Sequence, residues 1–206
     1  MKLLDHPDEF KTGIRTLLLV LRNKDGAASG PVKKMVSYSH EEFDEVVTSL
    51  LSFAATTPGG YRLYGSVDSR DFRAAQREFS LRKVNVDFTP EAIRFYRDLK
   101  NQWMGSLSQN SARASKLFLF DVDDPSEVAK KEVEDSIKGA HLLLKEVEDS
   151  IKGAHLFIDD TAPSPLIYSY QTKNGWHVIT RPFDVGALPP PVRGMCKTNA
   201  MMLWGF

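Results

Sequence analysis

The chain has 206 residues, of which 42% are hydrophobic and 26% charged, so it can bury a core and remain soluble. The single cysteine, Cys196, excludes an intrachain disulfide and a cysteine-based zinc site. The longest apolar run, residues 17–21, is far shorter than the roughly 20 residues that span a bilayer. The first residues are too acidic for a secretory signal. We therefore expect a soluble, cytoplasmic protein with no membrane partner.

Basic and acidic residues balance at 27 each, but they are distributed unevenly. Residues 61–100 hold nine Lys or Arg against six Asp or Glu, residues 116–160 hold six against twelve, and residues 161–206 hold four against one. An acidic middle between two basic stretches is compatible with a metal site beside a phosphate-binding surface, and solvated helix faces would give the same counts. Any site for a polyanion must therefore be local.

The first elements of the chain follow a ββα pattern. Apolar residues predict a strand over 14–24 and a second strand, antiparallel to it, over 33–38. Ser39 and Glu42 form a capping box that begins a helix, and the glycines of 58–60 end that helix.

The next elements are a strand and two helices. Residues 61–67 predict the strand, residues 71–79 predict a helix capped by its first aspartate, and Thr89-Pro90-Glu91 opens the second helix. Residues 106–115 are polar and predict a loop.

A strand over 116–122 is followed by a tandem duplication. The segment Lys131–Leu142 recurs unchanged as Lys145–Leu156, an offset of 14 residues. Because 14 residues return a helix to within about 40° of its starting face, one longer helix can absorb the extra copy. In the alternative, one copy docks on the core and the other loops out.

The remaining pattern predicts a hairpin over 166–183 and a last strand over 201–206. Asn174-Gly175 is typical of a two-residue type I′ turn. In that register one sheet face displays two tyrosines, a threonine, a histidine and an arginine, namely Tyr168, Tyr170, Thr172, His177 and Arg181. Arginine suits oxyanions and aromatic rings suit base stacking, so this face is a candidate nucleic-acid surface. The alternative is an ordinary half-exposed sheet face, and a one-residue slip would turn the whole set over.

The element order ββαβαα-β-α-ββ predicts an α+β fold in which helices cover a mostly antiparallel sheet. We expect a single domain over residues 1–206. Its N-terminal ββα part covers 1–60, its candidate catalytic part covers 61–206, and the duplicated helical segment lies at 131–158.

The most distinctive motif is the strand that ends in acids, Leu117 to Asp124. Strand alternation puts Asp121 and Asp123 on one face, about 7 Å apart at Cα. Such a pair suits oxygen ligands of one or two divalent cations, as in phosphoryl and nucleotidyl transfer. The structural alternative is an acid-rich turn between strand and helix. Asp124, in Asp124-Pro125-Ser126-Glu127, is expected to be the N-cap of the next helix.

Two motifs together resemble the archaeo-eukaryotic primase superfamily, which includes primase-polymerase-like domains of phages and plasmids. They are Leu119-Phe120-Asp121-Val122-Asp123, the last five positions of an hhhDhD strand, and Gly175-Trp176-His177, matching small-x-His. The resemblance covers roughly residues 61–183. It implies an RRM-like catalytic core in which Asp121 and Asp123 hold Mg²⁺ or Mn²⁺. His177 would contact the phosphates of the incoming nucleoside triphosphate.

The resemblance implies a metal-dependent nucleotidyltransferase that acts on single-stranded DNA or RNA in replication, in the host cytoplasm if a phage encodes it. Arg70, after the strand 61–67, is a further candidate for contact with the nucleotide. The family usually supplies a third acid from a later strand, and Asp184 is the only acid after His177. Either Asp184 serves as a metal ligand or one metal position is lost. The sequence shows no helicase or zinc-binding domain, so a separate helicase or accessory protein is an expected partner.

Two other functions stay open. A degenerate, non-catalytic member of the family would bind nucleotides or single strands without metal, through Tyr168, Tyr170, His177 and Arg181. Phe120-Asp121-Val122-Asp123 also resembles the motif of haloacid-dehalogenase-like phosphatases, in which the first Asp is a nucleophile and the second a general acid. Against this second resemblance, Asp124-Pro125 follows where that family has a small residue and then Thr or Val.

Overall fold

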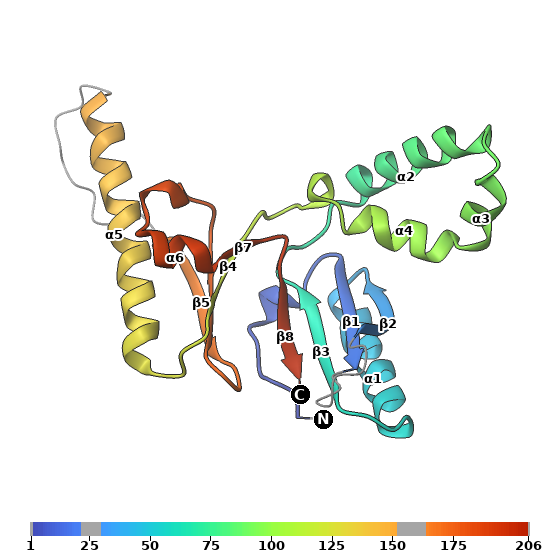
Figure 1. Cartoon of the computed structure of the whole chain (residues 1–206), viewed down its shortest axis with the longest axis horizontal. Helices are drawn as coiled ribbons and strands as arrows, with labels where there is room; N and C mark the ends of the chain where they lie inside the picture. The colour runs from blue at the N-terminus through green and yellow to red at the C-terminus, as the bar shows by residue number, and fades with distance from the viewer. Residues whose placement is uncertain (1, 22–29, 152–163, 206) are drawn as a thin grey trace. The chain divides into compact units, whose positions relative to one another are not determined.

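A computed structural model describes residues 2–21, 30–151 and 164–205. The chain forms two compact units, shown in Figure 1: unit 1 comprises residues 1–115 and 201–206, and unit 2 comprises residues 116–200. Each unit contains one four-stranded antiparallel sheet. The predicted α+β class and antiparallel pairing are confirmed, with two sheets where the sequence predicted one.

The sheet of unit 1 has the strand order β2-β1-β3-β8. Its strands are β1 (Arg15–Leu21), β2 (Gly30–Ser37), β3 (Tyr61–Ser66) and β8 (Met201–Gly205). The antiparallel pairing of the first two strands and the existence of the last strand are confirmed. A short 3-10 turn, η1 (Asp8–Phe10), precedes β1.

Helix α1 (His40–Thr56) packs against this sheet, as Figure 1 shows. The predicted cap is confirmed, because Ser39 accepts a hydrogen bond from the backbone N–H of Glu42 at 3.2 Å. The apolar stripe of α1 is buried and consists of Phe43, Val46, Val47 and Leu50. The ring of Phe43 lies 4.7 Å from that of Trp204 on β8, so the last strand contributes to this core.

Helices α2 (Phe72–Asp87), α3 (Ala92–Arg97) and α4 (Leu99–Leu107) follow β3. Asp71 caps α2 as predicted, but the helix continues well beyond residue 79. Phe79 explains the continuation, because its ring packs against both Phe95 and Trp103 and so keeps α2 in the bundle. The predicted loop over 106–115 instead contains the end of α4 and the 3-10 turn η2 (Asn110–Ala112).

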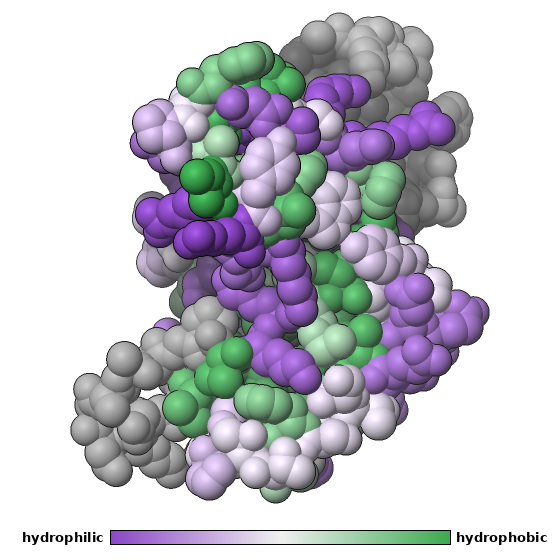
Figure 2. All heavy atoms as spheres, turned by 90° about the vertical axis from the view of Figure 1, so that its right-hand side faces the viewer, coloured by the Kyte–Doolittle hydropathy of each residue, from purple (hydrophilic) through white to green (hydrophobic). Residues whose placement is uncertain are grey.

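The core under these three helices is small. Its buried cluster consists of Ala75, Leu107 and Ala112. Large apolar side chains on the other side of the helices remain exposed, namely Leu81, Val84, Phe88 and Ile93. Figure 2 shows apolar areas interrupting the hydrophilic surface on the side of the molecule that it presents.

The sheet of unit 2 has the strand order β5-β6-β4-β7. Its strands are β4 (Phe118–Val122), β5 (Leu166–Gln171), β6 (Trp176–Thr180) and β7 (Cys196–Thr198). The sequence did not predict β7, because three residues are too few for strand alternation to be recognised. The turn η3 (Val185–Ala187) and helix α6 (Pro190–Met195) connect β6 to β7.

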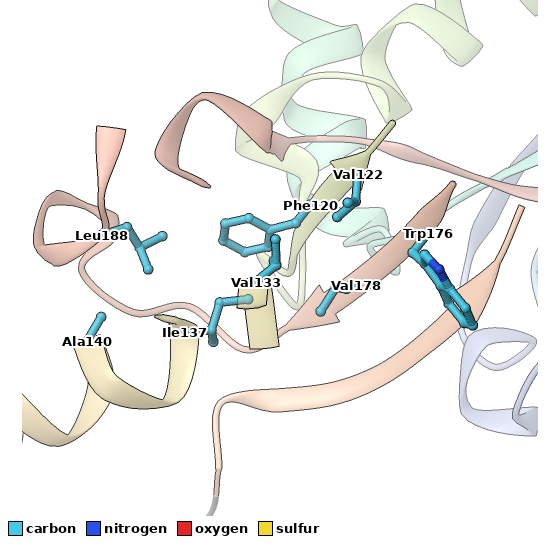
Figure 3. Close-up of a cluster of buried hydrophobic side chains, with 8 residues drawn as sticks. All are labelled: Phe120, Val122, Val133, Ile137, Ala140, Trp176, Val178 and Leu188. Atoms are coloured by element: carbon cyan, nitrogen blue, oxygen red, sulfur yellow. The ribbon is translucent and has the colours of Figure 1, made fainter. Parts of the chain in front are cut away.

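Helix α5 (Glu127–Ile151) covers one face of this sheet and supplies three of the eight residues of its core cluster. Figure 3 shows the cluster: Phe120, Val122, Trp176 and Val178 from the sheet, Val133, Ile137 and Ala140 from α5, and Leu188. Partly buried side chains of α6 pack on the same cluster. Both helices therefore lie on the face opposite to Asp121 and His177.

The cap of α5 differs from the prediction. The hydroxyl of Ser126 accepts a hydrogen bond from the backbone N–H of Ala129, so Ser126 is the N-cap. Asp124 instead accepts from the backbone N–H of Ser126 at 2.8 Å, in a turn before the helix. The prediction placed the cap two residues too early, because both side chains are good caps and only Ser126 directly precedes the first helical residue.

The duplicated segment is helical as far as the structure describes it. Helix α5 contains the whole first copy and continues into the second copy as far as Ile151. The rest of the duplicated segment, residues 152–158, lies outside the described residues. None of the helices in the described ranges is long and apolar enough to cross a membrane.

Candidate functional site

Asp121 and His177 lie directly opposite each other on neighbouring strands. The register of β4 and β6 pairs the two residues, and Nε2 of His177 lies 3.2 Å from Oδ1 of Asp121. Val122 points to the other face and into the core, as alternation predicts. The two predicted motifs, distant in sequence, therefore meet on one sheet face.

The absence of a side chain at Gly175 allows the start of β6 to lie close to the end of β4. A Cβ atom at Gly175 would lie 1.8 Å from the backbone carbonyl oxygen of Val122, a distance at which no side chain fits. The start of β6 thus approaches the end of β4 more closely than any other residue would permit. This contact gives a physical reason for the small residue of the small-x-His motif.

The predicted hairpin turn is wrong. The structure pairs Tyr170 with His177 and Tyr168 with Ile179, so the connection is four residues long, from Thr172 to Gly175. The N–H of Thr172 donates to the carbonyl of Gly175 at 2.8 Å and closes this turn. The crowding of Gly175 against β4 keeps this glycine out of the centre of a two-residue turn. Because the pairing is shifted by two residues, the predicted face of Tyr168, Tyr170 and His177 is retained.

A chain of polar contacts crosses this face. The hydroxyl of Tyr170 lies 2.5 Å from Nδ1 of His177, and its ring meets the imidazole edge-on at 5.1 Å between centroids. The rings of Tyr168 and Tyr170 are stacked at 5.5 Å. On the other side, the ammonium of Lys197, on β7, forms an ion pair with Oδ2 of Asp121.

Burial and neighbouring charges determine the protonation states of His177 and Asp121. Burial lowers the pKa of His177, and this effect exceeds the opposing effect of the Asp121 carboxylate. Burial works in the opposite direction on Asp121, but the hydrogen bond from Lys197 and the imidazole bring the pKa of that carboxyl below its ordinary value. We therefore infer an ionised Asp121 beside a neutral His177 at neutral pH.

The hydrogen bonds then fix the tautomer of His177. A carboxylate can only accept, so Nε2–H donates to Asp121. Nδ1 accepts from the hydroxyl of Tyr170. The nitrogen that faces the carboxylate thus carries the proton.

Lys197 is the residue of this site that the sequence did not reveal. Its side chain is 55% exposed, while that of Asp121 is 28% exposed. The short strand β7 follows Pro189, Pro190 and Pro191 and shows no periodic pattern. Only the net positive charge of residues 161–206 pointed towards a basic partner for the acidic strand.

The predicted metal ligands are Asp121, Asp123 and Asp184. Asp123 is exposed, and its charge raises the pKa of His177, so its carboxylate belongs to the same surroundings. Asp184 accepts from the N–H of Gly186 at 2.8 Å and caps η3. No group of three or more His, Cys, Asp or Glu that could hold a metal occurs in the described ranges. Two carboxylates still fit a Mg²⁺ that takes its other ligands from substrate phosphates and water.

The two predicted arginines belong to different units. Arg181 follows the end of β6, and its guanidinium donates to the carbonyl of Ser164 at 3.1 Å. Arg70 belongs to unit 1, where its backbone bridges Ile14 and Arg113. In the part of the chain that the structure describes, the guanidinium of Arg181 forms no hydrogen bond or ion pair with Asp121 or His177.

Comparisons with known proteins return no match: no family model, no curated protein and no solved structure is significantly similar to the chain. The phosphatase resemblance is disfavoured by the fold, because β4 is antiparallel to both of its neighbours while that family requires a parallel sheet.

Proposed function

We propose that the protein is a metal-dependent nucleotidyltransferase of primase-polymerase type that acts on single-stranded nucleic acid. The observation that carries this proposal is the direct cross-strand pairing of Asp121 with His177, with Asp123 two residues further along. A histidine N–H beside a pair of carboxylates is the arrangement that the motif resemblance implies for nucleotide binding.

Each side chain has a role that its surroundings support. Asp121 and Asp123 would hold Mg²⁺ or Mn²⁺, which neutralises the charge of the triphosphate and of the pyrophosphate that leaves. The neutral His177 offers its Nε2–H to an oxygen of the triphosphate once that oxygen replaces Asp121 as acceptor. Tyr170 is a positioning residue, because its hydroxyl holds the imidazole in this tautomer. The stacked rings of Tyr168 and Tyr170 offer a surface for a base.

The decisive experiment measures incorporation of labelled nucleotides on a single-stranded DNA template, primed and unprimed, in Mg²⁺ or Mn²⁺. The double variant Asp121→Ala/Asp123→Ala should lose incorporation to background, because it removes both carboxylate ligands. The matched control is Asp124→Ala, whose carboxylate accepts a hydrogen bond in the turn before α5 and which should retain wild-type incorporation. Circular dichroism establishes that each variant is folded. Normal incorporation by the folded double variant would refute the proposal.

A second function is favoured by a separate observation, the ion pair between Lys197 and Asp121. An ammonium beside this carboxylate already supplies a positive charge to the site. The same face would then bind nucleotides or single strands without a metal and without catalysis.

Anisotropy of a fluorescent single-stranded oligonucleotide in EDTA tests this second function. The wild type should bind in a salt-sensitive way, and Lys197→Ala should weaken binding by about tenfold, the loss expected for one charged contact. Arg181→Ala reports whether the end of β6 also contributes. Binding that survives EDTA without any incorporation would favour this function over the first, and binding that requires the metal would exclude it.

A further inference from the structure

Unit 1 contains a second concentration of charge that the proposed function does not use. Four ionisable side chains are buried where three segments meet: Arg15 and Arg70 are each 5% exposed, Asp68 is 0% exposed and the side chain of Arg113 is 8% exposed. Backbone hydrogen bonds join these segments, including Arg70 N–H to the carbonyl of Ile14 at 2.8 Å. The cluster therefore holds three guanidiniums and only one carboxylate in a place largely shielded from water.

Two of the three arginines have partners. Arg15 donates to four backbone carbonyls, those of Glu9, Thr12, Ser66 and Val67. Nε of Arg113 lies 2.5 Å from Oδ2 of Asp68, and Ser115 donates to the other oxygen of that carboxylate. The single acid of the cluster is thus already bound.

Arg70 differs from both. Its Nε and Nη1 are buried and have no hydrogen-bond partner among the described residues. Burial lowers the pKa of Arg70, against the attraction of Asp68, and the nearby Arg113 lowers it further. Two buried nitrogens of a guanidinium without an acceptor are costly in a protein, so the geometry calls for an acceptor beside Nε and Nη1.

We propose that Arg70 and its neighbours form an oxyanion site in unit 1, and that its ligand is a phosphate group carrying two negative charges. The planar fork of Nε and a terminal nitrogen matches two oxygens of such a group. The charge also matches, because three guanidiniums face one buried carboxylate, that of Asp68, and the exposed Glu9 acts on Arg15 and not on Arg70. Inorganic phosphate and a phosphate monoester have this chemistry, whereas a phosphodiester carries a single charge. The site is independent of the proposed nucleotidyl transfer in unit 2.

Titration calorimetry on the full chain tests the site, with inorganic phosphate at about pH 8, where phosphate is largely dianionic, and constant ionic strength. We expect saturable binding of one phosphate, and binding of a nucleoside monophosphate will show whether a monoester is accepted. A dinucleotide that carries only a phosphodiester should bind at least about tenfold more weakly. The proposal would be overturned if phosphate showed no saturable binding. It would also be overturned if chloride bound with the same affinity as phosphate.

The variants separate this site from the rest of the protein. Arg70→Met should weaken phosphate binding by about tenfold or more, and Arg70→Lys, which keeps the charge and loses the fork, should weaken it less. The exposed Arg73→Met is the matched control and should bind phosphate as the wild type does.

Thermal unfolding distinguishes a ligand site from a structural arginine. Without phosphate, Arg70→Met should be at least as stable as the wild type, because it removes an unpaired buried charge. Phosphate should stabilise the wild type and not this variant. Equal stabilisation of both proteins, or destabilisation of Arg70→Met and Arg70→Lys without any effect on phosphate binding, would show that Arg70 is structural only.

Discussion

At the scale of single residues, the site depends on which atoms of His177 carry protons. Tyr170 donates to Nδ1, and this bond exists only while that nitrogen is unprotonated, so it stabilises the neutral imidazole. Lys197 acts in the same direction through its charge. Both neighbours therefore keep His177 neutral beside a carboxylate that would otherwise favour its protonation.

We predict that Tyr170→Phe raises the pKa of His177, because the variant removes the bond that favours the neutral form. Lys197→Ala should raise it as well. A titration of the histidine ring signals by NMR measures the shift, with His40 of unit 1 as the internal control. A His177 signal that titrates identically in all three proteins would contradict the assigned tautomer.

The same shift predicts how stability depends on pH. The pKa of His177 lies below the histidine value of 6.5 that applies to the unfolded chain. The unfolded state then binds the proton first, so the contribution of His177 to stability is complete above about pH 6.5 and is lost as the pH falls towards the folded value. Urea unfolding of wild type and His177→Gln between pH 5 and about 8 should show that the variant loses less stability on acidification.

At the scale of secondary-structure elements, the site exists because β6 begins against β4. We predict that Gly175→Ala destabilises the protein by about 1–3 kcal/mol, the usual cost of forcing atoms into a filled space, and separates His177 from Asp121. Gly139→Ala is the matched control: nothing lies within 4 Å of its new Cβ in α5, and we expect it to stabilise by about 1 kcal/mol. Chemical unfolding of both variants measures the difference. Equal effects of the two substitutions would refute the crowding at Gly175.

The elements that the sequence predicted well are those with strong local signals. The N-cap at Ser39 and the acid-ended strand of Asp121 each follow from neighbouring residues, and the structure has both. The two-residue turn at Asn174-Gly175 was wrong, because the contact of Gly175 with Val122 comes from a strand more than 50 residues earlier, and such long-range contacts override local turn preference.

The candidate site was predictable in part for the same reason. The shared face of Tyr168, Tyr170 and His177 follows from strand alternation and is unchanged by the shift in register. Lys197 was not predictable, because β7 is three residues long and is defined by its pairing with β4. The single sheet expected from the element order became two, since element order does not determine which strands pair.

At the scale of the whole molecule, each unit has its own tryptophan at the centre of its packing. Trp204 is 4% exposed and lies against Phe43 and His6 in unit 1. Trp176 is 8% exposed in the core of unit 2 and donates to the carbonyl of Pro125. The two side chains therefore report on different cores.

We predict that Trp204→Ala destabilises unit 1 by about 3–5 kcal/mol and leaves the pKa of His177 unchanged. Trp176→Ala should instead destabilise unit 2 and change the pKa of His177. Hydrogen exchange, resolved by residue, shows which sheet loses protection. Uniform loss over both sheets in both variants would mean that the two cores unfold as one.

The pairing of β4 with β7 also bears on the order in which the chain folds. Unit 2 is a continuous stretch inserted between β3 and β8, and the strand β8 is synthesised after it. In folded unit 2, Phe118 pairs with Thr198, so the first and last residues of this unit lie close together. A folded insert thus shortens the loop that closes when β8 pairs with β3, and the bridge between Arg70 and Arg113 shortens it further, which lowers the entropy cost of that closure. We therefore expect unit 2 to fold before β8 pairs with β3, and its folding to favour the pairing of this edge strand with the first sheet.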